Sequence, residues 1–424
     1  MRSDPPWKLW PLALLALAAM QAATAADADV DALALESAIP PKTPTAQQTK
    51  ILFEAAAGVA QRRDGSGWRE ISRLSLDGRH GGALSESTRY SLSARVDATA
   101  PKDVRVDNPT FSLREAFLSW QGGDAANLID LGRINLRSGP AYGYNPTDYF
   151  RDNALRTITT ADPVLLRENR LGVAMIRGQH LWADGSLSLV IAPKLASQVS
   201  GEGLSFDWGA TNRVQRVLAS INNRWSGAFS SQLLMYKEQG SSMRWGASAT
   251  ALLSDSVTAH GEWARSRETD LLAGALALPS AAAARNRAAL GLTYTTSTKL
   301  SLTTEYQYNG FALVRDAVRS LPTLDPKALG AYFATALARQ DNAARQAVLL
   351  YLTQRDLVVK NLELTTLAKF NLSDGSHLIW VDLRYRQSLV EWALQLQRGH
   401  GSSSTEFGVI PFRKSIGVLA TAYF

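Results

Sequence analysis

The sequence predicts an all-β protein, a closed antiparallel transmembrane β-barrel of about eighteen strands. Three observations predict this fold: segments that alternate in polarity, a final strand that ends on an aromatic residue, and an export signal at the amino terminus. The chain has no cysteine, which excludes disulfides and thiolate metal sites. No apolar run after residue 25 reaches the roughly twenty residues that a transmembrane helix needs. A membrane-spanning chain of this kind must therefore cross with strands.

The alternation of polarity is clearest between residues 299 and 311. One face carries Leu300, Leu302, Thr304, Tyr306 and Tyr308, and the other carries Ser301, Thr303, Glu305, Gln307 and Asn309. In a membrane barrel such faces meet lipid and lumen, so Thr303 and Gln307 are expected to face water. We count about eighteen segments, with sixteen as the alternative, because bacterial single-chain barrels have even numbers. The segments start near Ile51, Arg69, Ser87, Phe111, Asn127, Arg167, Ser186, Asn212, Ala228, Met243, Val257, Arg287, Leu300, Ala347, Asn361, Ser376, Leu389 and Arg413.

The last segment, residues 413–424, reads RKSIGVLATAYF. Its apolar face ends on the carboxyl-terminal Phe424, and its other face ends on Tyr423. This segment resembles the closing strand of Gram-negative outer-membrane β-barrels. The resemblance implies that Tyr423 and Phe424 form an assembly signal, read by the barrel-assembly machinery, and that the barrel is surrounded by outer-membrane lipid. In architecture the whole mature chain is similar to porins and to the alginate-export-type barrels of Proteobacteria.

The amino terminus has the order of a signal peptide. Arg2 and Lys8 precede an apolar run, Leu9 to Ala23, and Ala25 ends a small-residue cleavage site. We therefore predict a cleaved signal peptide over residues 1–25 and a location in the cell outer membrane. Residues 26–50 are rich in Ala, Pro and acidic residues and do not alternate, which predicts a flexible periplasmic linker. The barrel is expected over residues 51–424.

The connections between segments alternate in length. The long ones are residues 138–166, 196–211, 268–284, 314–346 and 399–412, whereas 182–185, 224–227, 254–256 and 296–299 are short. Residues 237–242 and 373–375 are short connections at positions where the alternation expects long ones. Outer-membrane barrels have short periplasmic turns and longer external loops. Barrel closure has a physical cause, because each unpaired backbone group in hydrocarbon costs several kcal/mol.

Charged side chains are expected in the lumen. The formal net charge of the chain is +7, which favours anions. Acidic residues, namely Asp77, Asp97 and Asp382, share the inward faces, so an alternative is that the charges mainly satisfy one another. The inward basic residues are Arg73, Arg79, Arg89, Arg95, Arg384 and Arg386.

The connection over residues 138–166 is the third external one and is rich in turn signals, such as Gly139-Pro140 and Asp162-Pro163. In the general porin family the corresponding loop folds inward and narrows the pore. By that resemblance we expect an inward loop, and the alternative is a loop packed on the outer rim. The candidate residues for a constriction are Arg151, Arg156, Arg167, Asp148, Tyr142 and Tyr144.

Nothing in the sequence favours an enzyme. Of the five histidines, His260 alone shares a strand face with an acid and a hydroxyl group, Glu262 and Thr258. A G-x-S-x-G nucleophile motif and a histidine pair with metal-ligand spacing are both absent. We expect no catalytic residue, no metal and no cofactor. Nucleic-acid binding is excluded because no basic cluster has interleaved aromatic residues.

These observations favour a porin-like channel for passive or facilitated passage of small hydrophilic solutes, and the net charge points to anionic ones such as acidic sugars. Two alternatives remain: an exopolysaccharide export channel that works with an inner-membrane synthase, and a non-conducting structural barrel. The sequence leaves the oligomeric state open.

Overall fold

The structure, a computed structural model, describes residues 48–101, 107–315, 317 and 325–424. The predicted signal peptide and residues 26–47 of the predicted linker lie outside the described residues. The first strand begins at Gln48, three positions before the predicted start of the barrel.

The described residues form one closed antiparallel sheet of eighteen strands. Each strand pairs with its neighbours in the chain, and β1 also pairs with β18, which closes the barrel. Phe424 takes part in this closure, because its N–H donates to the carbonyl of Ile51 at 2.8 Å. The strands are Gln48–Arg62 (β1), Trp68–Ala83 (β2), Thr88–Ala100 (β3), Thr110–Gln121 (β4), Asn127–Ile134 (β5), Val173–Trp182 (β6), Gly185–Ala192 (β7), Arg216–Ser226 (β8), Phe229–Glu238 (β9), Arg244–Ser254 (β10), Val257–Glu268 (β11), Ala283–Thr295 (β12), Leu300–Asn309 (β13), Gln346–Gln354 (β14), Leu362–Asn371 (β15), His377–Gln387 (β16), Val390–His400 (β17) and Phe412–Tyr423 (β18).

The predicted fold class and strand number are confirmed. The predicted start of the sixth strand at Arg167 is wrong, since Arg167 lies in helix α2 (Pro163–Glu168) and β6 starts at Val173. The helix has a local cause: the Asp162 carboxylate caps the Val164 N–H at 2.9 Å, and Pro163 occupies the first helical position.

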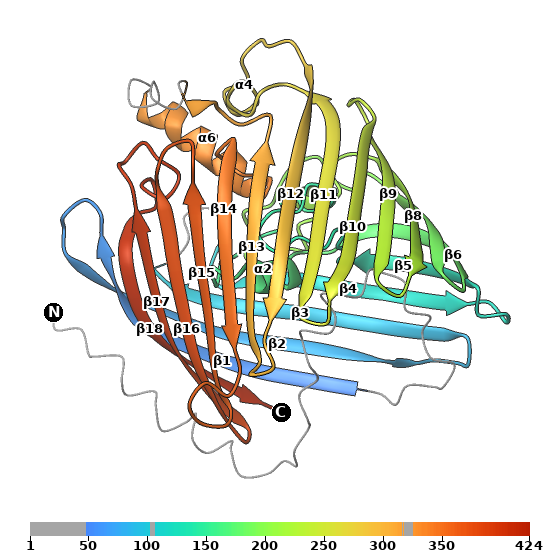
Figure 1. Cartoon of the computed structure of the whole chain (residues 1–424), viewed down its shortest axis with the longest axis horizontal. Helices are drawn as coiled ribbons and strands as arrows, with labels where there is room; N and C mark the ends of the chain where they lie inside the picture. Colours follow the sequence, from blue (N-terminus) through green and yellow to red (C-terminus); the bar gives the residue numbers. More distant parts are fainter. Residues whose placement is uncertain (1–47, 102–106, 316, 318–324) are drawn as a thin grey trace.

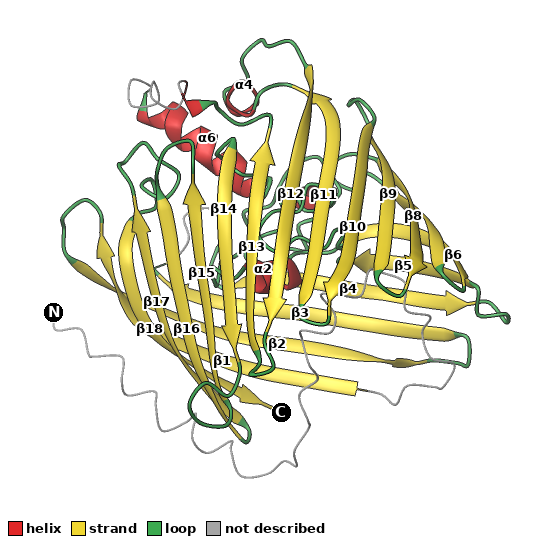
Figure 2. Ribbon diagram, in the orientation of Figure 1, coloured by secondary structure: helices red, strands yellow, loops and turns green. Residues whose placement is uncertain are grey.

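The two ends of the barrel differ as predicted. We call the end with the long connections, residues 135–172, 193–215, 269–282, 310–345 and 401–411, the loop rim. The opposite end, which we call the turn rim, has short connections such as 183–184, 227–228 and 255–256. Helices α4 (Leu271–Ala275) and α6 (Pro326–Ala338) lie at the loop rim, at the top of Figure 1. Figure 2 shows that helices occur in the connections and that strands make the whole wall.

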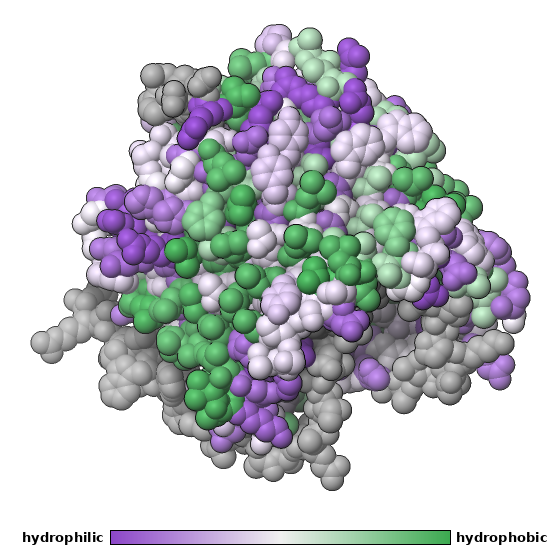
Figure 3. Space-filling view, in the orientation of Figure 1, coloured by the Kyte–Doolittle hydropathy of each residue, from purple (hydrophilic) through white to green (hydrophobic). Residues whose placement is uncertain are grey.

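The outside of the barrel is apolar. Outward-facing side chains such as Leu74, Leu189, Leu290 and Val418 are about half exposed, whereas their neighbours on the same strands point inward and are more buried. In Figure 3 hydrophobic side chains form a band across the middle of the visible face, and hydrophilic side chains gather above it at the loop rim. None of the described helices is long and apolar enough to cross a membrane. The apolar band is the surface that lipid chains would cover.

Adjacent residues of β17 test the assignment of the two faces. Leu394 points outward and is 39% exposed, whereas Gln395 points inward and donates to the Asp382 carboxylate at 2.7 Å. We expect Leu394→Lys to lower the free energy of unfolding by about 2–4 kcal/mol, because lysine at the lipid face must leave water. Gln395→Lys places the same charge beside Asp382 and should cost little. Urea unfolding in lipid vesicles measures the stability of both variants. Equal losses of unfolding free energy would contradict the assignment of Leu394 to the lipid face and Gln395 to the lumen face.

Candidate functional site

The connection between β5 and β6, residues 135–172, folds into the barrel, and we call it the inner loop. Its helix α2 appears behind the front wall in Figure 1. The inner loop contacts strands around most of the wall, so the expected inward fold is confirmed and packing on the outer rim is excluded. The contacts include Arg73 to the Thr159 carbonyl (2.6 Å), Asp162 to Tyr351 (3.1 Å), Glu168 to Arg79 (3.1 Å), Asn169 to Arg114 (2.9 Å) and the ring of Tyr149 stacked on that of Tyr236 (4.7 Å).

One wall carboxylate, that of Glu305 on β13, holds the start of the inner loop. It accepts backbone N–H groups from Tyr142 at 2.7 Å, Gly143 at 3.2 Å and Tyr144 at 3.1 Å. Gly143 allows this approach, because a Cβ there would lie 2.5 Å from the side chain of Leu349 on β14, the strand next to β13. Glu305 is completely buried. Such charge-assisted hydrogen bonds to several backbone donors are stronger than neutral ones.

A second wall carboxylate, that of Glu262 on β11, holds the next turn of the inner loop. It accepts the N–H of Ala141 at 2.8 Å, the hydroxyl of Thr147 at 2.7 Å and the amide of Asn145 at 3.0 Å. His260 and Glu262 share a strand face, as the sequence analysis noted. Glu262 uses that position to bind the inner loop. His260 is 7% exposed, and its Nε2 lies 3.4 Å from the Glu305 carboxylate.

The wall beneath the inner loop is covered. Thr303 and Gln307 are at most 1% exposed, and Gln307 accepts a hydrogen bond from Asn342 at 2.9 Å. The expectation that both face water is therefore wrong, because the inner loop at Gly143 and the chain at Asn342 pack over this part of β13. The alternation assigned these residues to the correct side of the wall but did not indicate what covers it.

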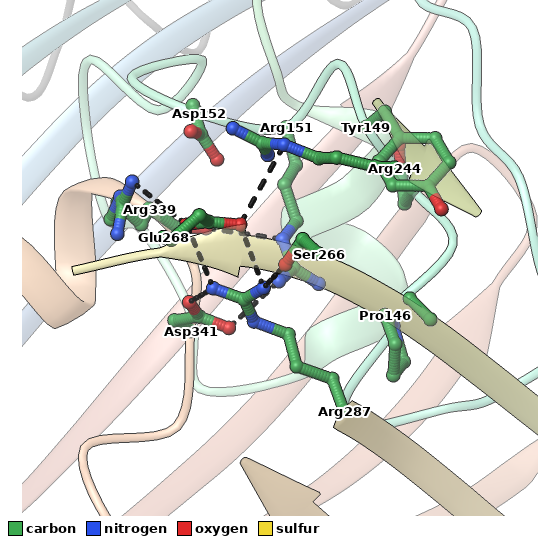
Figure 4. Close-up of a pocket in the computed structure, with 12 residues that line it drawn as sticks. Pro146, Tyr149, Arg151, Asp152, Arg244, Ser266, Glu268, Arg287, Arg339 and Asp341 are labelled. Atoms are coloured by element: carbon green, nitrogen blue, oxygen red, sulfur yellow. Dashed lines mark hydrogen bonds and ion pairs between the residues drawn. The ribbon is translucent and has the colours of Figure 1, made fainter. Parts of the chain in front are cut away.

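Arg151 does not face a constriction, in contrast to the expectation from the sequence. Its guanidinium is buried, donates to the carbonyls of Asn145 and Arg339, and forms an ion pair with Asp341 at 2.9 Å. Asp341 also pairs with Arg287 on β12 at 3.2 Å. Figure 4 shows this cluster of opposite charges, which joins the inner loop to the chain that follows α6 and encloses a cavity of about 20 Å³. Such a cavity holds about one water molecule, so the charged side chains fill the space between the two segments. We call the cluster of Arg151, Arg287 and Asp341 the latch.

Arg156 has a similar structural position. It is 5% exposed and donates to the carbonyls of Phe111 and Ser205, each at 2.7 Å, so it joins the inner loop to residues 193–215. The carbonyl groups satisfy most of the guanidinium donors, and the nearest carboxylate, that of Asp207, lies 3.7 Å from its Nε. The expected role of Arg156 at a constriction is thereby replaced by a role in packing the loops together.

The remaining candidates in the inner loop contact one another or the wall. Arg167 donates to the Ser138 carbonyl at 3.0 Å, and the Asp148 carboxylate, 2% exposed, pairs with Arg170 at 2.9 Å. Tyr144 is buried, and its hydroxyl donates to Asp341 at 2.7 Å. The Tyr142 ring lies against those of His260 and Tyr351, with centroid distances of 5.8 and 5.6 Å.

Accessible charges lie on the other side of the lumen. Side chains on the inward faces of β2 and β16 keep part of their surface in solvent: Arg79 is 50% exposed, Arg386 43%, Arg384 23% and Arg73 13%. Arg95 differs, since it is 5% exposed and paired with Glu54, Asp77 and Asp97. The inner loop thus packs against β9–β14 and also reaches β2 and β4. The more exposed arginines, Arg79, Arg384 and Arg386, lie toward the turn-rim ends of β2 and β16.

A cavity of about 330 Å³ lies near the turn rim. Lys50, Arg79, Ser93 and Glu115 stand directly opposite one another in a row across β1, β2, β3 and β4 and line it, and Arg89 lines it as well. The volume is within the range of small-molecule sites, about 300–1,000 Å³. Three basic groups and one carboxylate give the cavity a net positive lining.

Comparison with known proteins identifies the fold. No protein-family model matches the chain, and no curated protein matches its sequence. Among solved structures, OccAB1 of Acinetobacter baumannii superposes with a TM-score of 0.56 at 10% identity, covering 89% of this chain and 96% of that one. OccK11 (OpdR) of Pseudomonas aeruginosa gives 0.54 at 11% identity, with the same coverage of both chains. The chain has the fold of Gram-negative outer-membrane porins. This fold and the apolar exterior place it in the outer membrane.

A. baumannii OccAB4 gives a TM-score of 0.53 at 7% identity, covering 91% of this chain and 99% of that one. Because all three identities are low, the likeness is one of fold.

The sequence would not have indicated that Glu262 and Glu305, the two wall carboxylates that hold the inner loop, are functional, since both appear in it as ordinary inward-facing polar residues. The only available signal was the rarity of carboxylates on otherwise uncharged strand faces.

Proposed function

We propose that this protein is an outer-membrane channel for small hydrophilic solutes and that it favours anions. The observation that carries the proposal is the set of arginines that stay in contact with solvent inside the lumen, near the turn rim. The inner loop buries the wall along β9–β14, while Arg79 on β2 and Arg384 and Arg386 on β16 keep part of their surface in solvent. A partly filled lumen suits small solutes better than a polymer, which is why passage of small solutes is preferred to polysaccharide export.

Within this proposal, hydroxylated acids such as acidic sugars are the solutes that the cavity near the turn rim fits. Arg79 offers a planar fork for a carboxylate, and Ser91, Ser93 and Glu115 offer partners for hydroxyl groups. The ion pair between Arg79 and Glu168 is partly exposed, with Glu168 27% accessible. An exposed pair is weak, so a passing carboxylate can replace Glu168 at Arg79.

The reversal potential of the purified protein in a planar bilayer, measured in a salt gradient, tests the proposal. The wild-type barrel should conduct and favour anions, and the double variant Arg79→Ser, Arg386→Ser should shift the reversal potential toward cations, because it removes two cations from the lumen. The matched control, Arg224→Ser with Lys299→Ser, removes two exposed cations at the turn rim, each 62% exposed, and should change the potential little.

Each outcome separates the candidates. A barrel that does not conduct would favour the structural barrel, and conductance with an unshifted potential would contradict the role of the two arginines. Blockage by long acidic polysaccharides but not by glucuronate would favour the export channel.

A further inference from the structure

The basic cavity near the turn rim lies where the described chain enters the barrel. Gln48, the first described residue, and Lys50 both line this cavity. Residues 48–50 pair with β2 and extend beyond the end of β18, whose pairing with β1 begins at Leu52. The chain that precedes Gln48 is therefore attached to the wall of the cavity itself.

The cations around this entry point are available to an anion. Lys50 is exposed and forms no ion pair with another described residue. The ion pair of Arg79 with Glu168 is partly exposed, at 50% and 27%, and such a pair is weak. Arg386 is 43% exposed and lies on β16, the third strand from β1 across the closure of the barrel. Three strand spacings correspond to about 15 Å along the wall.

The cavity also has room for a side chain from outside the wall. On the inward face of β2 the position after Arg79 is Gly81, which carries no side chain and lines the cavity. The resulting space of about 330 Å³ is open toward the lumen and large enough for a small organic acid. An acidic side chain with its backbone fits the same space.

The segment that precedes Gln48 has the complementary charge. Residues 26–47 contain four acidic residues and one lysine, which gives a formal side-chain charge of −3. Glu36 precedes Gln48 by twelve positions, a length of chain that spans at most about 40 Å. This reach exceeds the distance from β1 to Arg79 and to Arg386. The four acids are Asp27, Asp29, Asp31 and Glu36.

Attachment to the cavity wall gives these acids an advantage over a free solute. A group on a short flexible linker has an effective concentration in the millimolar range at a site within its reach. A free carboxylate at Arg79 must therefore compete with tethered carboxylates of the same chemistry. The competition is electrostatic, and it weakens in concentrated salt because the screening length falls to about 3 Å at 1 M.

We propose that the acidic segment, residues 26–47, occupies the basic cavity at the turn rim and regulates the entry of anionic solutes there. Asp31 and Glu36 bind Lys50 and Arg79, and a solute enters the cavity by displacing them. The regulatory effect rests on the proposed channel function, whereas the contact between the segment and the cavity does not.

Zero-length coupling with a carbodiimide, which joins a carboxylate directly to a lysine amine, tests the contact in the protein purified from outer membranes. Peptide mass spectrometry should find Lys50 joined to an acid of the segment, in several-fold excess over Lys360, and the coupling should be lost at 1 M salt. Lys360 is the control, because it is exposed at the same rim in the turn between β14 and β15. Equal coupling of the two lysines, or no coupling of Lys50, would overturn the proposal.

Current block by glucuronate in a planar bilayer tests the regulation. A variant with Asp27→Asn, Asp29→Asn, Asp31→Asn and Glu36→Gln should be blocked at a several-fold lower glucuronate concentration than the wild type. The matched control also neutralises three aspartates and one glutamate, which are exposed in the short turns of the same rim, and should be blocked like the wild type. It carries Glu86→Gln, Asp124→Asn, Asp184→Asn and Asp255→Asn.

The two measurements separate this inference from the channel function. Equal block of the acid-free variant and the wild type would overturn the regulatory role. Coupling at Lys50 in a barrel that does not conduct would support the contact and contradict the channel. Migration of unheated samples on gels shows that each variant is folded.

Discussion

Replacing Glu305 with glutamine is expected to free the inner loop from the wall and to raise single-channel conductance several-fold. Glutamine keeps the size of the side chain but has one acceptor oxygen and brings an NH₂ group toward the backbone donors of Tyr142, Gly143 and Tyr144. Each buried donor left without a partner costs about 1–3 kcal/mol. Because these bonds hold the start of the loop, their loss should let the loop leave the lumen. Planar-bilayer conductance and limited proteolysis within residues 135–172 measure the release.

The control for this variant is Glu391→Gln, on the opposite wall. Glu391 is almost as buried as Glu305, but its ion pairs are with Arg384 and Arg386 on the neighbouring strand of the wall. Its replacement should leave the loop resistant to protease. If Glu305→Gln and Glu391→Gln give the same cleavage and the same conductance, the wall carboxylate does not hold the loop.

Asp341→Asn is expected to disrupt the latch at the loop rim and to lower the stability of the loop packing by about 3–5 kcal/mol. The Asp341 carboxylate pairs with Arg151 and Arg287 and accepts the hydroxyl of Tyr144. Removing one partner of a buried ion pair leaves the other charge uncompensated, which accounts for this magnitude. The temperature at which residues 310–345 become sensitive to protease measures the effect. Asp64→Asn, which alters an exposed ion pair with Arg62, should change that temperature little.

The same latch predicts a dependence on pH. Burial by itself would raise the pKa of Asp341, but Arg287, Arg151 and Arg339 outweigh it and hold this pKa below its ordinary value of 3.8. A carboxylate with a lowered folded pKa contributes stability above its unfolded pKa and loses that contribution as the pH falls through the folded one. The wild-type latch should therefore persist at pH 4 and open only in stronger acid, whereas Asp341→Asn should show no such acid step. An acid step of equal size in both proteins would assign the titration to another group.

If the inner loop and the latch behave in this way, the selectivity of the channel depends on residues that the loop does not supply. Arg151 and Arg156 are occupied by carbonyl and carboxylate partners, so their replacement should loosen the loops before it alters ion preference. Arg79 and Arg386, on the opposite side, remain available to a solute. The positioning of the loop and the choice of ions are thus separate functions of separate groups of arginines.

The sequence alone determined the barrel, its strand number and the direction of most side chains. These properties follow from local alternation, because a strand has a period of two and lipid accepts only a closed sheet. Where the local pattern is broken, the prediction weakens. At Gly132, whose φ is 139°, Arg133 and Ile134 are both buried and the alternation of β5 is lost.

Only the tertiary structure decided which inward residues meet solvent. Tyr142 and Glu305 are 163 positions apart in the chain, and the loop contributes backbone N–H groups, which are present at every residue except proline. No side-chain pattern can therefore indicate where the loop attaches. Likewise the sequence analysis assigned both Arg151 and Arg386 to the lumen. Arg151 is buried in the latch and Arg386 is exposed to solvent because of the path that residues 135–172 take across the lumen. Burial of this kind is a property of the assembled loops and wall, and local periodicity does not encode it.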